Sequence, residues 1–170
     1  MGADFLIVDT TPSRYEAEAK TLFAAMTVQP SAARKTTINN LIKSLKADGN
    51  WSPLDALWVP AAATQQAGRL NWKTPSTLTL TENNSPAWVA DQGYTGDGAT
   101  SYIDTSYNPS TGAINLSQNS ASLGVYIRTN ISEATTDVGM DDGGTKYFSI
   151  LSRLSDTTYY AIFESTGGFN

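Results

Sequence analysis

The chain of 170 residues contains no cysteine and no histidine. Without cysteine it can form neither a disulfide framework nor a thiolate site for zinc or an iron–sulfur cluster. Without histidine it lacks the commonest general base and metal ligand, so a Ser-His-Asp triad is excluded. Carboxylate chemistry is the main catalytic route that these two absences leave open.

Long apolar runs are lacking as well. No stretch approaches the roughly 20 apolar residues that a membrane-spanning helix needs, so we expect no membrane span. Residues 1–12 carry Asp4 and Asp9 where a secretory signal peptide carries lysine. The sequence therefore predicts a product of the cytoplasm, made without a signal peptide.

Basic residues are scarce in the second part of the chain. Residues 1–73 carry eight Lys/Arg and six Asp/Glu, a net charge of +2, whereas residues 74–170 carry three and ten, a net charge of −7. A module this acidic repels a phosphate backbone, so nucleic acid is not an expected partner. The basic residues of the first part either dock onto an acidic surface of another protein or form a solvated helix face, and the sequence leaves both open.

The first part of the chain has helical periodicity. After Ser13, apolar residues recur at the spacing of one helix face, and a second such stretch begins near Pro30 and ends at Gly49, a residue suited to a left-handed cap. These stretches predict a helical hairpin, preceded by an extended arm at residues 5–8 and followed by a packed connector. The apolar positions are Tyr15, Ala19, Leu22, Phe23, Met26, Ile38, Leu41, Ile42 and Leu45.

From residue 72 onward, apolar residues recur at every second position. Apolar residues alternate with polar ones over residues 77–81 and 121–128, and residues 146–151 and 158–163 are further candidate strands. Turn-rich pieces separate these segments, which favours an antiparallel β-sandwich or jelly roll. We therefore predict an α+β chain, with an arm and helical segment at 1–71 and a sandwich at 72–170.

Several separate motifs, occurring in order, carry a resemblance to a known group of proteins. Over roughly residues 26–128, the chain resembles bacteriophage and prophage virion proteins in which a concanavalin A-like (laminin G-like) jelly roll follows a small helical segment. The motifs are Trp51-x-x-Leu54-Asp55-Ala56-Leu57-Trp58, Gln66-Ala67-Gly68-Arg69-Leu70-Asn71-Trp72-Lys73, Gly93-Tyr94-Thr95-Gly96-Asp97-Gly98-x-x-Ser101-Tyr102-Ile103-Asp104-Thr105, Asn108-Pro109-Ser110 and Gln118-Asn119-Ser120-Ala121-Ser122-Leu123-Gly124-Val125.

This resemblance implies a non-enzymatic structural protein of the virion, tail- or fibre-associated, with a jelly roll that binds host-surface carbohydrate. It implies other virion proteins as partners, and a homo-oligomer or a larger assembly. The alternative of the same kind is a capsid decoration or head-fibre protein with a purely architectural role. Jelly rolls of the family continue well beyond the length found here, so the resemblance also implies a sandwich that is incomplete or completed by a neighbouring chain.

Three tyrosines are the candidate carbohydrate-binding residues. Sugar sites commonly pair an exposed aromatic face with polar groups, and Tyr94, Tyr102 and Tyr107 stand among Asn, Asp and Thr residues. The alternative is that they are half-buried strand aromatics, which are common in β cores.

Carboxylates supply the other candidate sites. Asp137, Asp141 and Asp142, followed by two glycines, offer oxygen ligands for calcium, although their spacing does not match the EF-hand pattern and favours an acidic turn; no other cofactor is expected. A weak glycan hydrolase is the remaining alternative function. It needs two carboxylates on one sheet face, whereas Glu82, Glu133 and Glu164 each stand alone in the sequence.

Overall fold

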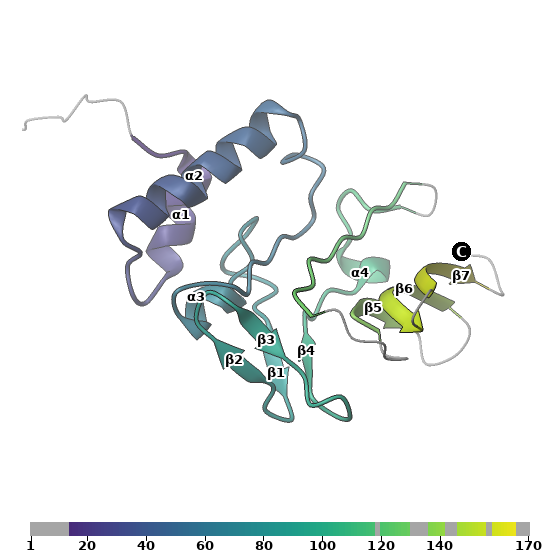
Figure 1. The fold of residues 1–170 in the computed structure, drawn as a ribbon. Coiled ribbons are helices and arrows are strands. Elements are labelled where there is room, and N and C mark those ends of the chain that lie inside the picture. Colours follow the sequence, from purple (N-terminus) through teal and green to yellow (C-terminus); the bar gives the residue numbers. More distant parts are fainter. Residues whose placement is uncertain (1–13, 118–119, 130–135, 142–145, 156–157, 166–170) are drawn as a thin grey trace, which may run out of the picture. The chain divides into compact units, whose positions relative to one another are not determined.

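The computed structural model describes residues 14–117, 120–129, 136–141, 146–155 and 158–165 (Figure 1). It combines helices with small antiparallel sheets, so the predicted α+β class is confirmed at that level. The chain divides into two compact units, Met1–Tyr107 and Asn108–Asn170. The predicted division at residues 71 and 72 follows a change of sequence pattern and does not coincide with these units, because Trp72 belongs to the core of the first unit.

The first unit opens with the predicted helical hairpin, formed by α1 (Ala17–Ala25) and α2 (Ala32–Ala47). Ser31 caps the start of α2, because its Oγ accepts a hydrogen bond from the backbone N–H of Arg34 at 3.3 Å. Gly49 follows the end of α2 with a φ of +73°, the left-handed conformation in which glycine has no side-chain penalty. The predicted arm at residues 5–8 lies outside the described residues.

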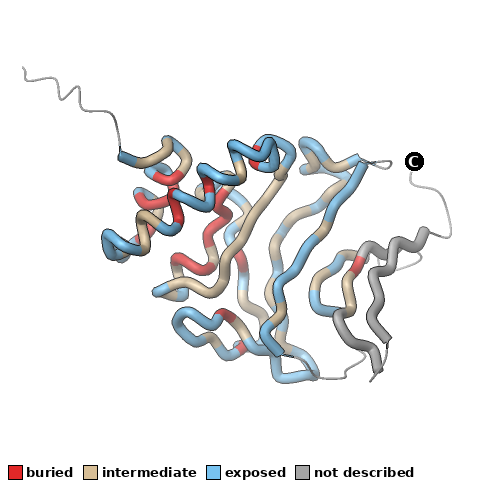
Figure 2. Tube along the Cα trace, turned by 45° about the horizontal axis from the view of Figure 1, so that its top comes forward, coloured by how far each residue is buried: buried red, intermediate tan, exposed pale blue. Residues whose placement is uncertain are grey.

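The core of the first unit lies between the hairpin and the connector after it, which contains the short helix α3 (Gln65–Arg69). Figure 2 shows the buried positions gathered along these segments. Leu22 and Ile42 are fully buried there, as the helical periodicity predicts. The connector is thus packed against the helices, and the strands of the first unit follow it along the chain.

Two small antiparallel sheets complete the first unit. Strand β1 (Thr81–Asn83) pairs with β4 (Tyr102–Asp104), and β2 (Ala87–Val89) pairs with β3 (Gly93–Thr95) (Figure 1).

The prediction of a strand over residues 77–81 is wrong except at its last residue. Leu78 has a φ of +53°, which interrupts an extended backbone, and its carbonyl oxygen accepts a hydrogen bond from Trp58 Nε1 at 2.8 Å. Leu80 is buried, and its backbone N–H donates to the carbonyl of Arg69. Contacts with the connector therefore replace strand pairing in this segment.

In the described residues of the second unit, the regular elements are a single helical turn and a three-stranded sheet. The turn is α4 (Pro109–Gly112), and the sheet has the order β5 (Val138–Asp141), β6 (Lys146–Ser155), β7 (Thr158–Ser165), antiparallel throughout. The predicted strands at 146–151 and 158–163 are confirmed as β6 and β7. The jelly-roll arrangement of the whole β part stays a prediction.

The predicted strand over residues 121–128 is wrong. Residues 121–129 have no regular secondary structure, and the Tyr126 side chain is 89% exposed. Alternation of apolar and polar residues indicates which side chains would share a face of a strand. A strand also needs hydrogen bonds to a neighbouring strand, and within the described ranges this segment pairs with none. Among the helices in the part of the chain that the structure describes, none has the length and apolar character to cross a membrane.

Candidate functional site

The pair of strands β1 and β4 presents one face made of small polar groups and a single aromatic ring. Asn83 lies opposite Tyr102 in the antiparallel register, and Thr81 lies opposite Asp104. Because directly opposed residues, and residues two apart on a strand, share a face, these four side chains lie on the same side of the sheet. Tyr102 is 56% exposed, Thr81 and Asp104 are exposed, and Asn83 is half-buried. We call these four residues the β1–β4 face.

The opposite side of this sheet is anchored to the rest of the unit through Glu82. Its Oε1 accepts hydrogen bonds from the Tyr94 hydroxyl at 2.6 Å and from Gln65 Nε2 at 2.9 Å, and Arg69 Nε lies 4.0 Å away. Gln65 and Arg69 belong to α3, whereas Tyr94 belongs to β3. One carboxylate oxygen thus joins three elements and fixes which side of the β1–β4 pair points outward.

The loop between β3 and β4 is held by a single carboxylate. Asp97 Oδ1 accepts hydrogen bonds from the backbone N–H groups of Ala99, Thr100 and Ser101, each at 2.9 Å. These donors favour the ionised form and lower the pKa of Asp97 well below its usual range. Asn84, just after β1, donates from Nδ2 to the carbonyl of Thr100 at 2.8 Å. The loop that leads into Tyr102 is therefore tied to the neighbouring strand.

The three tyrosines selected from the sequence lie in different surroundings. The hydroxyl of Tyr94 donates to Glu82, and that of Tyr107 donates to Asp55 Oδ2 at 2.6 Å. Both tyrosines are half-buried, and burial, followed by the adjacent carboxylate, raises the pKa of each. Tyr102 alone of the three offers a largely exposed ring. The structure therefore separates the three predicted residues and leaves Tyr102 as the accessible one.

Sequence reasoning missed the residues that surround Tyr102 on this face, namely Thr81, Asn83 and Asp104. Both strands are short, and of the residues 81–83 only Thr81 falls within the strand predicted over residues 77–81. The alternation within each strand indicates which residues share a face. The register that places Asn83 opposite Tyr102 depends on the fold of the intervening residues.

The acids proposed as calcium ligands fall in the second unit. Asp137 is exposed, and its backbone N–H donates to the carbonyl of Ile150 at 3.0 Å. Asp141 ends β5, but its side chain and all of Asp142 lie outside the described residues. Within the described ranges no group of three or more acidic side chains is positioned to hold a metal ion. The calcium site stays a prediction.

Glycoside hydrolysis would need two carboxylates of the β part on one face of a sheet. The β1–β4 face carries one acid, Asp104, whose Oδ1 accepts a hydrogen bond from the backbone N–H of Ser106 at 2.7 Å. Glu82 lies on the opposite side and is engaged as described, whereas Glu133 and the side chain of Glu164 lie outside the described residues. This face can therefore offer hydrogen bonds and a stacking surface, with a single carboxylate.

Comparisons with protein-family models, with curated proteins and with solved structures found no match to this chain.

Proposed function

We propose that this chain is a non-enzymatic structural protein of a bacteriophage particle, tail- or fibre-associated, whose β1–β4 face binds carbohydrate on the host surface. The observation that carries the binding part is the exposed Tyr102 ring, set beside the side chains of Thr81, Asn83 and Asp104. A sugar ring has apolar C–H patches that stack on an aromatic face and hydroxyls that pair with amide, hydroxyl and carboxylate groups. The β1–β4 face combines these chemical types.

The setting in a particle is supported by the ordered motifs that resemble phage virion proteins. One of them, residues 93–105, contains β3, β4 and the Asp97 loop, so the resemblance covers part of the proposed site. In this proposal residues 72–170 belong to a jelly-roll-like sandwich, and the hairpin contacts other virion proteins. Among the basic side chains of α2, Lys35 and Lys43 supply a surface for an acidic neighbour, because Lys46 pairs with Glu16 and Glu18 and Arg34 pairs with Asp91.

The non-enzymatic part of the proposal is supported by the side chains available. Glycoside hydrolysis ordinarily uses two carboxylates flanking the bond that breaks. The β1–β4 face has only Asp104, and the whole chain lacks histidine and cysteine. A protein of this kind retains a glycan without shortening it.

Binding is tested with immobilised host-surface polysaccharide. A Tyr102→Ala variant is expected to lose about tenfold in affinity, the effect of removing one aromatic contact worth about 1.4 kcal/mol. The matched control is Tyr126→Ala, because Tyr126 is also an exposed tyrosine but lies in the other unit. Equal retention of both variants and the wild-type protein would remove the β1–β4 face from the proposal. Shortened polysaccharide would overturn the non-enzymatic claim.

The particle setting has a separate test. Purified phage particles are digested and searched for peptides of this chain by mass spectrometry, and its density is located in a particle reconstruction. Presence at the tail or fibre supports the proposal, and presence on the capsid supports the architectural alternative. Absence from purified particles would overturn the virion assignment, whatever the polysaccharide experiment gives.

A further inference from the structure

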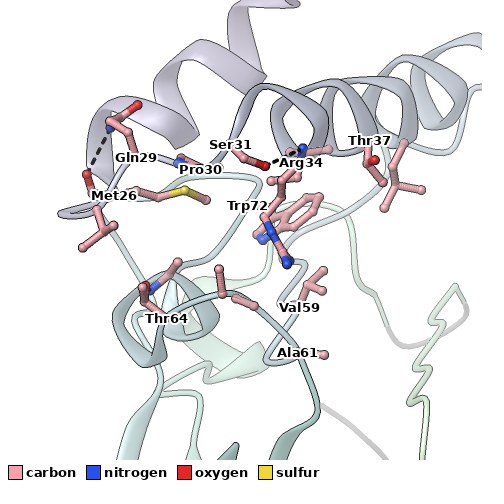
Figure 3. A pocket seen from close by; sticks show the side chains of 16 residues that line it. Met26, Gln29, Pro30, Ser31, Arg34, Thr37, Val59, Ala61, Thr64 and Trp72 are labelled. Atoms are coloured by element: carbon pink, nitrogen blue, oxygen red, sulfur yellow. Dashed lines mark hydrogen bonds between the residues drawn. The ribbon is translucent and has the colours of Figure 1, made fainter. Parts of the chain in front are cut away.

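A cavity of about 440 Å³ opens in the first unit between the helical hairpin and the connector. Its walls come from the turn between α1 and α2, residues 34–41 of α2, residues 59–67 and Trp72 (Figure 3). The lining is mainly apolar, and the volume falls in the range of about 300–1,000 Å³ typical of sites that take a ligand. Apolar residues of the lining include Met26, Val28, Leu41, Val59, Ala62 and Trp72.

Two of these apolar side chains are left open to water. Val28 is 59% exposed and Leu41 is 44% exposed, although both line the same hollow. Arg34 is the one charged residue of the lining. Its guanidinium pairs with Asp91 at 2.7 Å, but both side chains are substantially exposed, and an exposed ion pair of this kind exchanges readily for another acid. The groove thus suits an apolar segment that carries negative charge.

The chain itself contains a segment with this chemistry. Residues 4–9 read Asp-Phe-Leu-Ile-Val-Asp, four large apolar residues in succession between two acids, with no base. The apolar run complements the lining, and the flanking acids complement Arg34. We propose that residues 4–9 of one copy of the chain bind in this groove of a second copy.

The length of the chain favours a second copy over the same one. Arg14 is tied to Thr36, because its guanidinium donates to the Thr36 Oγ1 at 3.4 Å. At 3.6 residues per turn, Thr36 lies about 140–160° around α2 from Leu41 and Arg34, a path of about 15 Å over a helix with side chains. The five residues 9–13, one of them proline, span at most about 17 Å. The segment of the same chain would reach the side of the groove formed by Arg34 and Leu41 with little slack, whereas that of a second copy has no such limit.

The copy-to-copy contact stands apart from the phage assignment and from the β1–β4 face. It does not require carbohydrate binding, and a chain without glycan affinity would still make it. If two copies exchange the segment reciprocally, the contact closes into a dimer with twofold symmetry.

The first test uses a synthetic peptide of residues 3–10 carrying a fluorescent label, added to the full chain. We expect saturable binding, and at least a tenfold loss of affinity for the Leu41→Asp variant. Val89→Asp is the matched control, because Val89 is also half-exposed and lies outside the lining. Far-UV circular dichroism and thermal unfolding establish that each variant is folded. If Leu41→Asp fails to fold, Arg34→Glu takes its place, with recovery expected for a peptide in which both acids are replaced by lysine. No binding, or equal binding by the wild-type protein and a folded groove variant, would overturn the proposal.

The second test separates a second copy from the same chain. Light scattering across a concentration series is expected to show association of the wild-type chain and none for Leu41→Asp or for the double variant Leu6→Asp/Ile7→Asp. Mixing these two variants restores association, since one supplies the intact groove and the other the intact segment. A wild-type chain that stays monomeric at every concentration while the peptide binds the double variant more tightly would place the segment in its own groove. That result would overturn the exchange between copies.

Discussion

An Asn71→Ala substitution is expected to lower the free energy of unfolding of the first compact unit by about 2 kcal/mol. The Asn71 side chain is fully buried, and its Oδ1 accepts hydrogen bonds from the backbone N–H groups of Leu57 and Lys73 at 3.1 and 3.0 Å. This one oxygen joins the connector to the segment that follows α3. Alanine removes the acceptor and leaves two donors without it.

The magnitude follows from those two donors and one opposing contribution. An unsatisfied buried donor costs about 1–3 kcal/mol, and because Leu57 and Lys73 are only partly buried, a value in the lower half of that range, about 1.5 kcal/mol, applies to each. The Asn71 Nδ2 is buried and has no hydrogen-bond partner within the described residues, so its removal returns part of the loss. The net expectation is therefore close to 2 kcal/mol.

Urea unfolding followed by tryptophan fluorescence measures this change, because all four tryptophans lie in the first unit. The matched control is Asn40→Ala, at an exposed position in α2 where alanine favours the helix, so we expect a change within about 0.5 kcal/mol. If Asn71→Ala also unfolds within about 0.5 kcal/mol of the wild-type chain, the reasoning from the buried carbonyl fails.

Two further predictions concern local geometry. Gly68→Ala places a Cβ 2.6 Å from the carbonyl oxygen of Pro60 and is expected to cost about 1–3 kcal/mol by urea unfolding, whereas Gly96→Ala, with its nearest neighbour at 3.5 Å, should stay near wild type. The lowered pKa of Asp97 means that its stabilising contribution is complete above the ordinary pKa of an aspartate, near 3.8, and is lost as pH falls toward the lowered value. Urea midpoints of wild type and Asp97→Asn should therefore differ at pH 6 and converge toward pH 2; a constant difference would contradict this.

Helical elements were readable from the sequence because their determinants are local. The apolar spacing, the Ser31 cap and Gly49 all act within a few residues of one another, and the hairpin forms where they predict it. Residues 77–81 carry an equally clear alternation. There the decisive contacts come from Trp58 and Arg69 in the connector, and a contact between distant segments leaves no mark in a local pattern.

The candidate site was readable only in part for the same reason. An aromatic residue among polar ones drew attention to Tyr102, but equally to Tyr94 and Tyr107, whose carboxylate partners lie 12 and 52 residues away along the chain. These distant partners engage the hydroxyls of Tyr94 and Tyr107, and the residues next to each tyrosine in the sequence do not indicate them. The companions of Tyr102 depend on the strand register, which the side chains of the two short strands do not specify alone.

The anchoring of Glu82 affects which residues of the β1–β4 face can be substituted during evolution. A slip of one residue between β1 and β4 would turn Tyr102 inward, and the contacts of Glu82 with Tyr94 and Gln65 oppose that slip from the covered side. Substitutions at positions 81, 83 and 102 therefore leave those anchoring contacts in place. Such a surface can acquire new ligand preferences one residue at a time on an unchanged scaffold.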